Sequence, residues 1–124
     1  MPLVSGATAP TFDLPHATFT GLASPSRGST ETSVWRLVLA PGAEPVPHSL
    51  TREEIFVAVA GSAVATVDGA THTVETGDAL VVPAGAAFSL ANPGDEPFEA
   101  VTVFPVGGQA VTPGSEPFTP PWAA

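Results

Sequence analysis

Two side chains that can carry protons near neutral pH, His48 and Glu54, lie in one short segment of the chain. Leu50 follows His48 at an interval of two residues, and Phe56 follows Glu54 at the same interval. Because side chains alternate along a β-strand, each polar residue shares a face with its apolar follower. Burial raises the pKa of a carboxyl group and lowers that of an isolated imidazole, while an ion pair between them opposes both changes. We therefore predict that His48 and Glu54 are catalytic acid–base groups in a mostly apolar pocket.

A structural role is the alternative for this pair, since buried ion pairs also occur without catalysis. Arg36 alternates with Trp35 and Leu37. Arg36 therefore either points inward, where it could hold an anionic group of a ligand, or lies on the outer surface. A shift of the strand register by one residue would exchange these two positions. The predicted ligand-binding residues are Arg36, Leu50, Phe56 and Phe88.

Three further residues have open roles. His16 lies in an N-terminal arm that could reach the pocket of a neighbouring subunit. His72 follows the hairpin dipeptide Asp68-Gly69 and either faces solvent or serves as a replacement metal ligand. Trp122, in a Pro-Pro-Trp sequence, either anchors the C-terminal segment or covers the pocket mouth.

The composition excludes several kinds of chemistry. The 124 residues include no cysteine and no lysine, so the chain forms no disulfide, thiolate nucleophile, iron–sulfur cluster or lysine Schiff base. Its net charge is −9, with Arg27, Arg36 and Arg52 as the only Lys or Arg residues, so we expect neither a nucleic-acid nor a membrane partner. The first ten residues do not resemble a signal peptide, and a cytoplasmic location is expected.

Short apolar runs separated by turn residues predict an all-β protein, either a sandwich or a barrel. The expected strands are Thr11–Leu14, Ala17–Gly21, Ser33–Ala40, Ile55–Ala60, Ser62–Val67, Thr71–Glu75, Ala79–Val82, Ala87–Ala91 and Phe98–Phe104. We divide the chain into an N-terminal arm (1–30), a β-barrel (31–104) and a Pro-rich tail (105–124) that is expected to be extended.

The spacing of eight residues within 31–104 resembles the two motifs of the cupin superfamily. The matching residues are Gly42, His48, Glu54, Gly61, Gly77, Pro83, Gly85 and Asn92. This resemblance implies a single-domain antiparallel jelly-roll β-barrel of the RmlC-like type, in which three His and one Glu hold a divalent metal. Leu50 and Phe88 stand where the family has its second and third His. We therefore expect no tightly bound metal and no other cofactor. A divalent transition metal on His48 and Glu54, with His16 or His72 recruited, is the alternative.

The predicted function is that of a small-molecule-binding cupin. It is expected to be a metal-free or weakly metal-binding isomerase, epimerase, cyclase or lyase that acts on a small apolar organic substrate through His48 and Glu54. Two alternatives stay open: a non-catalytic ligand-binding or sensor cupin, and a metal-dependent cupin with an unusual site of His48, Glu54 and water. The resemblance further implies a homodimer, in which the N-terminal arm lends a strand to the partner's sheet.

Overall fold

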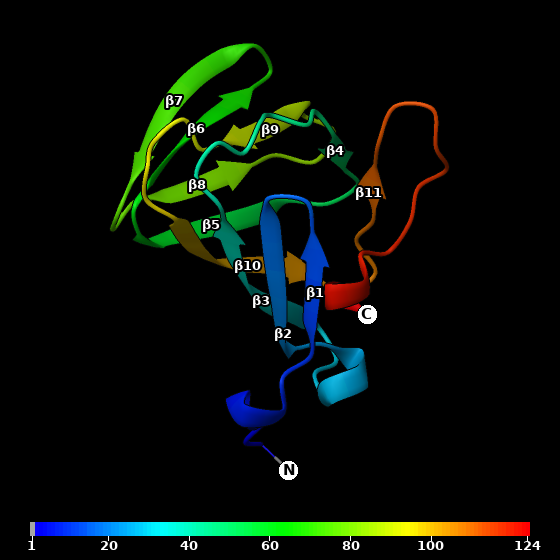
Figure 1. Ribbon diagram of the computed structural model, residues 1–124. Helices are drawn as coiled ribbons and strands as arrows, with labels where there is room; N and C mark the ends of the chain where they lie inside the picture. The colour runs from blue at the N-terminus through cyan, green and yellow to red at the C-terminus, as the bar shows by residue number, and fades with distance from the viewer. Residues whose placement is uncertain (1) are drawn as a thin grey trace.

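Short strands joined by tight turns make up the computed structural model, which describes residues 2–124 (Figure 1). The strands are β1 (Thr11–Leu14), β2 (Ala17–Ala23), β3 (Thr32–Leu39), β4 (Ser49–Leu50), β5 (Glu54–Ala60), β6 (Ser62–Val67), β7 (Ala70–Glu75), β8 (Ala79–Val82), β9 (Phe88–Ala91), β10 (Phe98–Pro105) and β11 (Ala110–Val111). Three short 3-10 helices are also present: η1 (Gly6–Thr8), η2 (Pro25–Arg27) and η3 (Pro121–Ala123).

All strand pairs are antiparallel, and they form three sheets. The largest sheet has the order β1-β2-β3-β10-β5-β8, the second has the order β7-β6-β9, and β11 pairs with β4. In Figure 1, β6, β7 and β9 lie together at the top of the view, beyond the edge of the larger sheet. The predicted all-β antiparallel architecture is confirmed, although the strand ladders do not join into one closed barrel.

The turn chemistry read from the sequence produces the expected β6–β7 hairpin. Asp68 and Gly69 both have positive φ values, of 47° and 83°. A two-residue hairpin turn of this type needs positive φ at both positions, which Asp-Gly tolerates well. The sequence did not predict β4 and β11, because a two-residue strand has no alternating pattern to detect. The tail prediction is corrected accordingly: residues 105–124 include β11 and η3 as well as extended chain.

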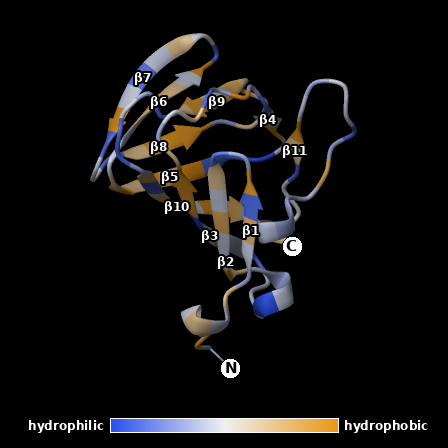
Figure 2. Cartoon of the chain, viewed as in Figure 1, coloured by the Kyte–Doolittle hydropathy of each residue, from blue (hydrophilic) through white to orange (hydrophobic). Residues whose placement is uncertain are grey.

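Alternation along β3 and β10 places one face of each strand in the core. Trp35, Leu37 and Leu39 are buried, whereas Arg36 between them is exposed. Phe98 and Phe104 are fully buried on the inward face of β10. Figure 2 shows strongly apolar colours on β5 and β8 and mixed colours on β7.

The N-terminal arm and the C-terminal segment both join the large sheet. Strand β2 pairs with β3 of the same chain, so the arm extends its own sheet. The indole of Trp122 in η3 stacks on the Phe19 ring, with centroids 3.7 Å apart and an interplanar angle of 5°. The Ser33 hydroxyl donates a buried hydrogen bond of 2.7 Å to the Ala123 carbonyl oxygen. Trp122 therefore anchors the C-terminal segment, which is one of the two roles predicted for it.

Asn92 has a structural role in this fold. Its side-chain amide nitrogen donates to the carbonyl oxygens of Leu39 (3.0 Å) and Glu96 (2.8 Å), and its side-chain oxygen accepts from the Gly94 amide (3.1 Å). These bonds satisfy a fully buried polar side chain. They also connect the turn after β9 to the end of β3, where the loop that leads to His48 begins.

Candidate active site

A cavity of about 410 Å³ lies on the inward face of the large sheet. Small-molecule sites commonly have volumes of about 300–1,000 Å³. Its interior wall is made by buried residues: Trp35, Leu37, Leu39, Ala43, Leu50, Glu54, Phe56, Phe88 and Ala110. Its mouth is made by exposed residues: Leu14, Pro15, His16, Glu44, Val46 and Phe118. The cavity is thus apolar inside, with few polar groups.

His48 is held at the cavity wall by β9. Its backbone N–H donates to the Phe88 carbonyl oxygen (2.9 Å), and the Phe88 N–H donates to the His48 carbonyl oxygen (2.8 Å). The imidazole lies against the Phe88 ring, with centroids 4.2 Å apart. Its Nδ1 is 3.1 Å from the Val46 carbonyl oxygen. Because a carbonyl only accepts, this bond assigns the proton to Nδ1 and leaves the lone pair on Nε2.

Burial lowers the pKa of His48, and the hydrogen bond to Val46 partly opposes this effect. Burial disfavours the charged imidazolium, because the cavity wall offers less solvation than water. The imidazole is therefore neutral at neutral pH. A neutral imidazole with its lone pair on Nε2 is equipped to act as a general base.

Glu54 begins β5 opposite Val82, and its side chain is 4% exposed. Burial raises the pKa of Glu54 to about 8, and it is the only cause of the shift. A carboxyl group without a charged partner in an apolar wall stays protonated, because nothing replaces the water that would solvate its charge. At neutral pH Glu54 is therefore a carboxylic acid that can donate a proton.

The two groups act on each other less than the sequence suggested. Neither pKa shift includes a contribution from the other group. Both side chains line the cavity, but burial acts on each separately and in opposite directions. This arrangement differs from an ion pair, since at neutral pH both groups are uncharged. A neutral base and a neutral acid facing one apolar cavity have the protonation states that general acid–base catalysis needs.

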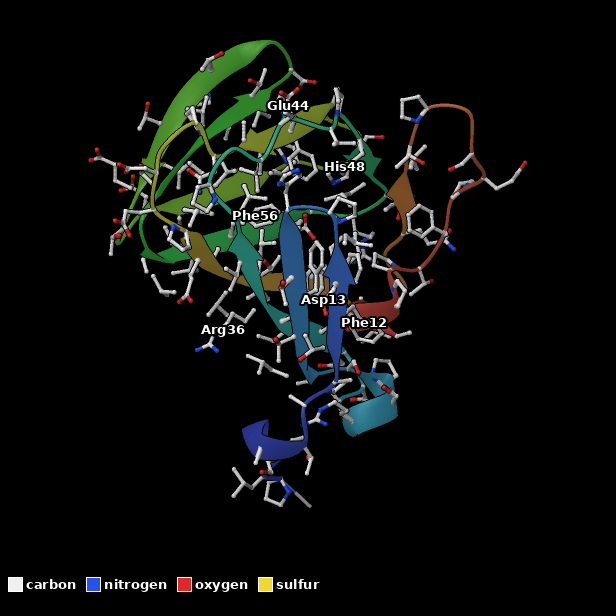
Figure 3. All side chains as sticks on the ribbon, in the orientation of Figure 1. Phe12, Asp13, Arg36, Glu44, His48 and Phe56 are labelled. Carbon is white, nitrogen blue, oxygen red and sulfur yellow. The ribbon has the colours of Figure 1, made fainter. Side chains whose placement is uncertain are left out.

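Three of the predicted ligand-binding residues line the cavity: Leu50, Phe56 and Phe88. The prediction for Arg36 is corrected, because Arg36 is exposed and does not line the cavity. In Figure 3 its side chain points away from the sheet, whereas Phe56 and His48 lie toward the molecule's interior. The reason is alternation: Trp35 and Leu37 take the inward face of β3, and Arg36 takes the outward one.

The other two histidines lie in different places. His16 lies at the mouth of its own chain's cavity, in the turn between β1 and β2, with a positive φ of 65°. Its carbonyl oxygen accepts a hydrogen bond of 2.8 Å from the Ala40 N–H, which holds the turn over the end of β3. His72 lines a separate groove of about 460 Å³ beside β7 and β8, so it is not part of the cavity.

The sequence analysis missed two aromatic residues of the cavity, Phe19 and Trp35, and left the place of Trp122 open. All three line the cavity, and they come from β2, β3 and η3. Alternation with the predicted pocket residues could not identify Phe19 or Trp122, because their segments lie outside the two motifs. The only sequence signal for Trp122 was a large aromatic residue in a Pro-rich segment, which does not show what it packs against.

Comparison with known proteins establishes the class of this protein. The cupin domain family matches residues 35–104, more than half of the chain. The chain therefore belongs to the cupin family. No curated protein sequence matches it significantly.

Solved structures confirm the jelly-roll fold. The polyketide cyclase RemF from Streptomyces resistomycificus is similar over 94% of this chain and 87% of its own, with a TM-score of 0.79 and 17% identity. An RmlC-like cupin from Shewanella frigidimarina NCIMB 400 is similar over 85% of this chain and 90% of its own, with a TM-score of 0.72 and 18% identity.

A larger protein contains the same fold. A salicylate 1,2-dioxygenase from Pseudoaminobacter salicylatoxidans, determined with gentisate, is similar over 86% of this chain but 31% of its own, with a TM-score of 0.71 and 18% identity. At these identities the likeness shows the fold alone. The likeness to the RemF cyclase and to the RmlC-like cupin, of which 87% and 90% are covered, supports a small single-domain cupin. Among residues 2–124, no helix is long and apolar enough to cross a membrane.

The family's metal site requires donors that this cavity lacks. Leu50 and Phe88, at the positions of two family histidines, are buried apolar side chains on the cavity wall. Within the described part of the chain, no three His, Cys, Asp or Glu side chains lie close enough to hold a metal, so His16 at the mouth does not complete a set with His48 and Glu54. The donor set does not fit the family's four-ligand metal, and two protein ligands hold a first-row metal only weakly.

Replacing both Leu50 and Phe88 by His is expected to create a strong divalent metal site. The double variant should retain near-stoichiometric zinc after gel filtration, because it restores four ligands around the cavity. The wild-type protein should retain far less. Elemental mass spectrometry measures both, with the single variant Leu50→His as an intermediate control. Near-stoichiometric metal in the wild-type protein would contradict the expectation.

Proposed function

We propose that this cupin is an enzyme that transfers protons on a small apolar organic substrate, in a reaction of the isomerase, cyclase or lyase type. The observation that carries the proposal is the pairing of a buried, uncharged carboxylic acid, Glu54, with a neutral imidazole, His48, on one apolar cavity. A purely ligand-binding protein gains nothing from a titratable carboxyl group that is costly to bury. Perturbed groups that converge on a cavity are typical of catalytic sites.

The chemistry follows from the protonation states. His48 Nε2 takes a proton from a carbon next to a substrate carbonyl, while Glu54 donates its proton to the carbonyl oxygen. The C–H bond breaks, an O–H bond forms and the product is an enol, with His48 now cationic and Glu54 anionic. Return of a proton to another atom isomerises the substrate, and attack of the enol carbon on a second carbonyl closes a ring. The fold similarity to a polyketide cyclase supports a reaction of this class only at the level of the shared fold.

Deuterium exchange tests the proposal without knowledge of the natural substrate. The probe is 2-tetralone, an uncharged aromatic ketone with exchangeable hydrogens next to its carbonyl, in heavy water. The wild-type protein should accelerate exchange, and His48→Gln should slow it by about 100-fold or more, the usual range for a general base. NMR measures the loss of the proton signal. His72→Ala, outside the cavity, is the matched control and should exchange at the wild-type rate.

The pH dependence of this exchange has two expected limits. Exchange should fall at acidic pH as His48 becomes protonated, at a pKa below 6.5, and at alkaline pH as Glu54 ionises near pH 8. Binding of 2-tetralone without exchange above the buffer rate would support the alternative of a non-catalytic binding or sensor protein. Exchange that appears only with added metal would support the metal-dependent alternative.

A homodimer stays a prediction, as does a cytoplasmic location. Support for a dimer comes from the outward face of the large sheet, where Val57, Val59 and Val81 are between 37% and 49% exposed. A row of paired β-branched residues, Val34, Val103, Ile55 and Val81, crosses the same face. These side chains form an apolar strip on the face, which a second copy would cover.

A further inference from the structure

We propose that the cavity selects an uncharged, flat aromatic substrate and rejects anionic counterparts of the same size. This inference deepens the proposed function, because it names the class of molecule on which His48 and Glu54 would act. It depends on the charges, the aromatic walls and the mouth of the cavity, and each of these is a separate observation.

The cavity offers no arginine or lysine to an anion. The chain has no lysine. Arg27 donates to backbone carbonyl oxygens, including those of Thr8 (3.0 Å) and Ser5 (2.7 Å), Arg36 is exposed on the outward face of β3, and Arg52 is exposed in the turn before β5. None of the three lines the cavity. A carboxylate that entered would lose its hydration with no arginine or lysine to replace it, which is costly.

The acidic side chain at the mouth acts in the same direction. Glu44 is exposed there, whereas the buried Glu54 is uncharged at neutral pH and repels no anion. The whole chain has a net charge of −9, which disfavours the approach of anions. A substrate that is neutral at the working pH avoids both effects.

The walls favour a flat ring. Six of the chain's nine Phe and Trp residues line this one cavity, so aromatic side chains are concentrated there. Phe56 and Phe88 lie together on one side, with ring centroids 5.8 Å apart. The stacked pair of Phe19 and Trp122 contributes another part of the wall. Aromatic rings favour offset stacking and edge contacts with other rings, so a planar aromatic ligand gains more here than an aliphatic chain.

The mouth extends the apolar character to the surface. Three of the exposed large apolar side chains, Leu14 (51%), Val46 (67%) and Phe118 (41%), lie at the mouth of the cavity. Exposed apolar groups at the rim of a cavity typically mark contact with a ligand. The substrate is therefore expected to reach the mouth with an apolar portion, and it need not be fully enclosed.

Intrinsic fluorescence tests the inference directly, because both tryptophans of the chain, Trp35 and Trp122, line the cavity. The probes are naphthalene-2-carboxamide and naphthalene-2-carboxylate, which share a ring and a size and differ in charge at neutral pH. The amide should change the fluorescence in a saturable way. The carboxylate should bind at least about tenfold more weakly, which corresponds to about 1.4 kcal/mol.

Two variants sharpen this test. Val46→Lys adds a cation at the exposed mouth and should strengthen binding of the carboxylate, so that the affinities for amide and carboxylate differ less. Val46→Met, whose side chain has a similar length but no charge, should leave the difference in affinity unchanged. Arg36→Ala should leave both affinities unchanged, because Arg36 lies outside the cavity. An equal or tighter affinity for the carboxylate, or no saturable response to the amide, would overturn the inference. These are binding measurements, so they can fail or succeed independently of the exchange assay that tests the proposed function.

Discussion

Replacing Glu54 by Gln is expected to remove catalysed exchange and to stabilise the protein at alkaline pH. Gln has nearly the shape of a protonated Glu but cannot donate a carboxylic proton, so exchange should fall by about 100-fold or more. The native protein keeps Glu54 protonated up to about pH 8, whereas the unfolded chain ionises it near the usual 4.5. The contribution of this group to the free energy of unfolding is therefore complete below about pH 4.5. It is lost as the pH rises from about 4.5 to about 8.

The difference between the folded and unfolded pKa values of Glu54 limits this loss of unfolding free energy to about 5 kcal/mol. Thermal unfolding across that pH range measures it: the midpoint of Glu54→Gln should fall less steeply with pH than that of the wild-type protein. Glu53→Gln is the matched control, because it makes the same change of side chain at the exposed neighbour in sequence. Parallel pH profiles for the wild-type protein and Glu54→Gln would show that the carboxyl group is not held neutral.

Replacing Gly61 by Ala is expected to destabilise the fold far more than replacing Gly77. Both glycines have positive φ, 72° and 96°, where a side chain costs roughly 1–2 kcal/mol. A Cβ on Gly61 would also overlap the carbonyl oxygen of Pro97 and approach the Phe98 Cα at 3.1 Å, whereas a Cβ on Gly77 would meet nothing within 4 Å. Backbone atoms cannot move aside as a flexible side chain can, so Gly61→Ala should lose about 3 kcal/mol or more.

Urea unfolding of the two variants measures this difference, with Gly77→Ala as the control for the cost of positive φ alone. If both variants lost the same stability, the overlap with Pro97 would be relieved by a small shift of the turn before β10. Gly61 is also one of the eight residues whose spacing resembles the cupin motifs. A glycine at position 61 is therefore explained by the close approach of the Pro97 carbonyl oxygen and not only by the turn conformation.

The parts of the site that sequence reasoning could place are those in which alternation and motif spacing agree. Glu54 and Phe56 share the buried face of β5, as alternation predicted. His48 and Phe88 are paired by two backbone hydrogen bonds although forty residues separate them in sequence, and the motif resemblance placed both in the pocket. A period of two residues and a fixed spacing are strong local signals.

The parts that could not be placed depend on contacts between segments distant in sequence. Nothing in the tail indicates that Trp122 stacks on Phe19, because no periodic pattern links them. Arg36 could be placed only to within one residue of register, and that residue decides which face it occupies. The separate burial of His48 and Glu54, rather than an ion pair, depends on the three-dimensional course of the wall, which spacing alone does not specify.

The position of β10 between β3 and β5 also constrains how the chain folds. Strand β3 pairs with β10 over a long sequence separation, since Thr32 lies opposite Pro105, whereas the β6–β7 hairpin is local. Non-local pairing requires a large loop to close first, and proteins dominated by such pairs fold in milliseconds to seconds. Trp35 and Leu37 come from β3, and Glu54 and Phe56 from β5, so these two walls meet only after β10 has inserted between them. The cavity as a whole is therefore expected to be complete only once this non-local pairing has formed.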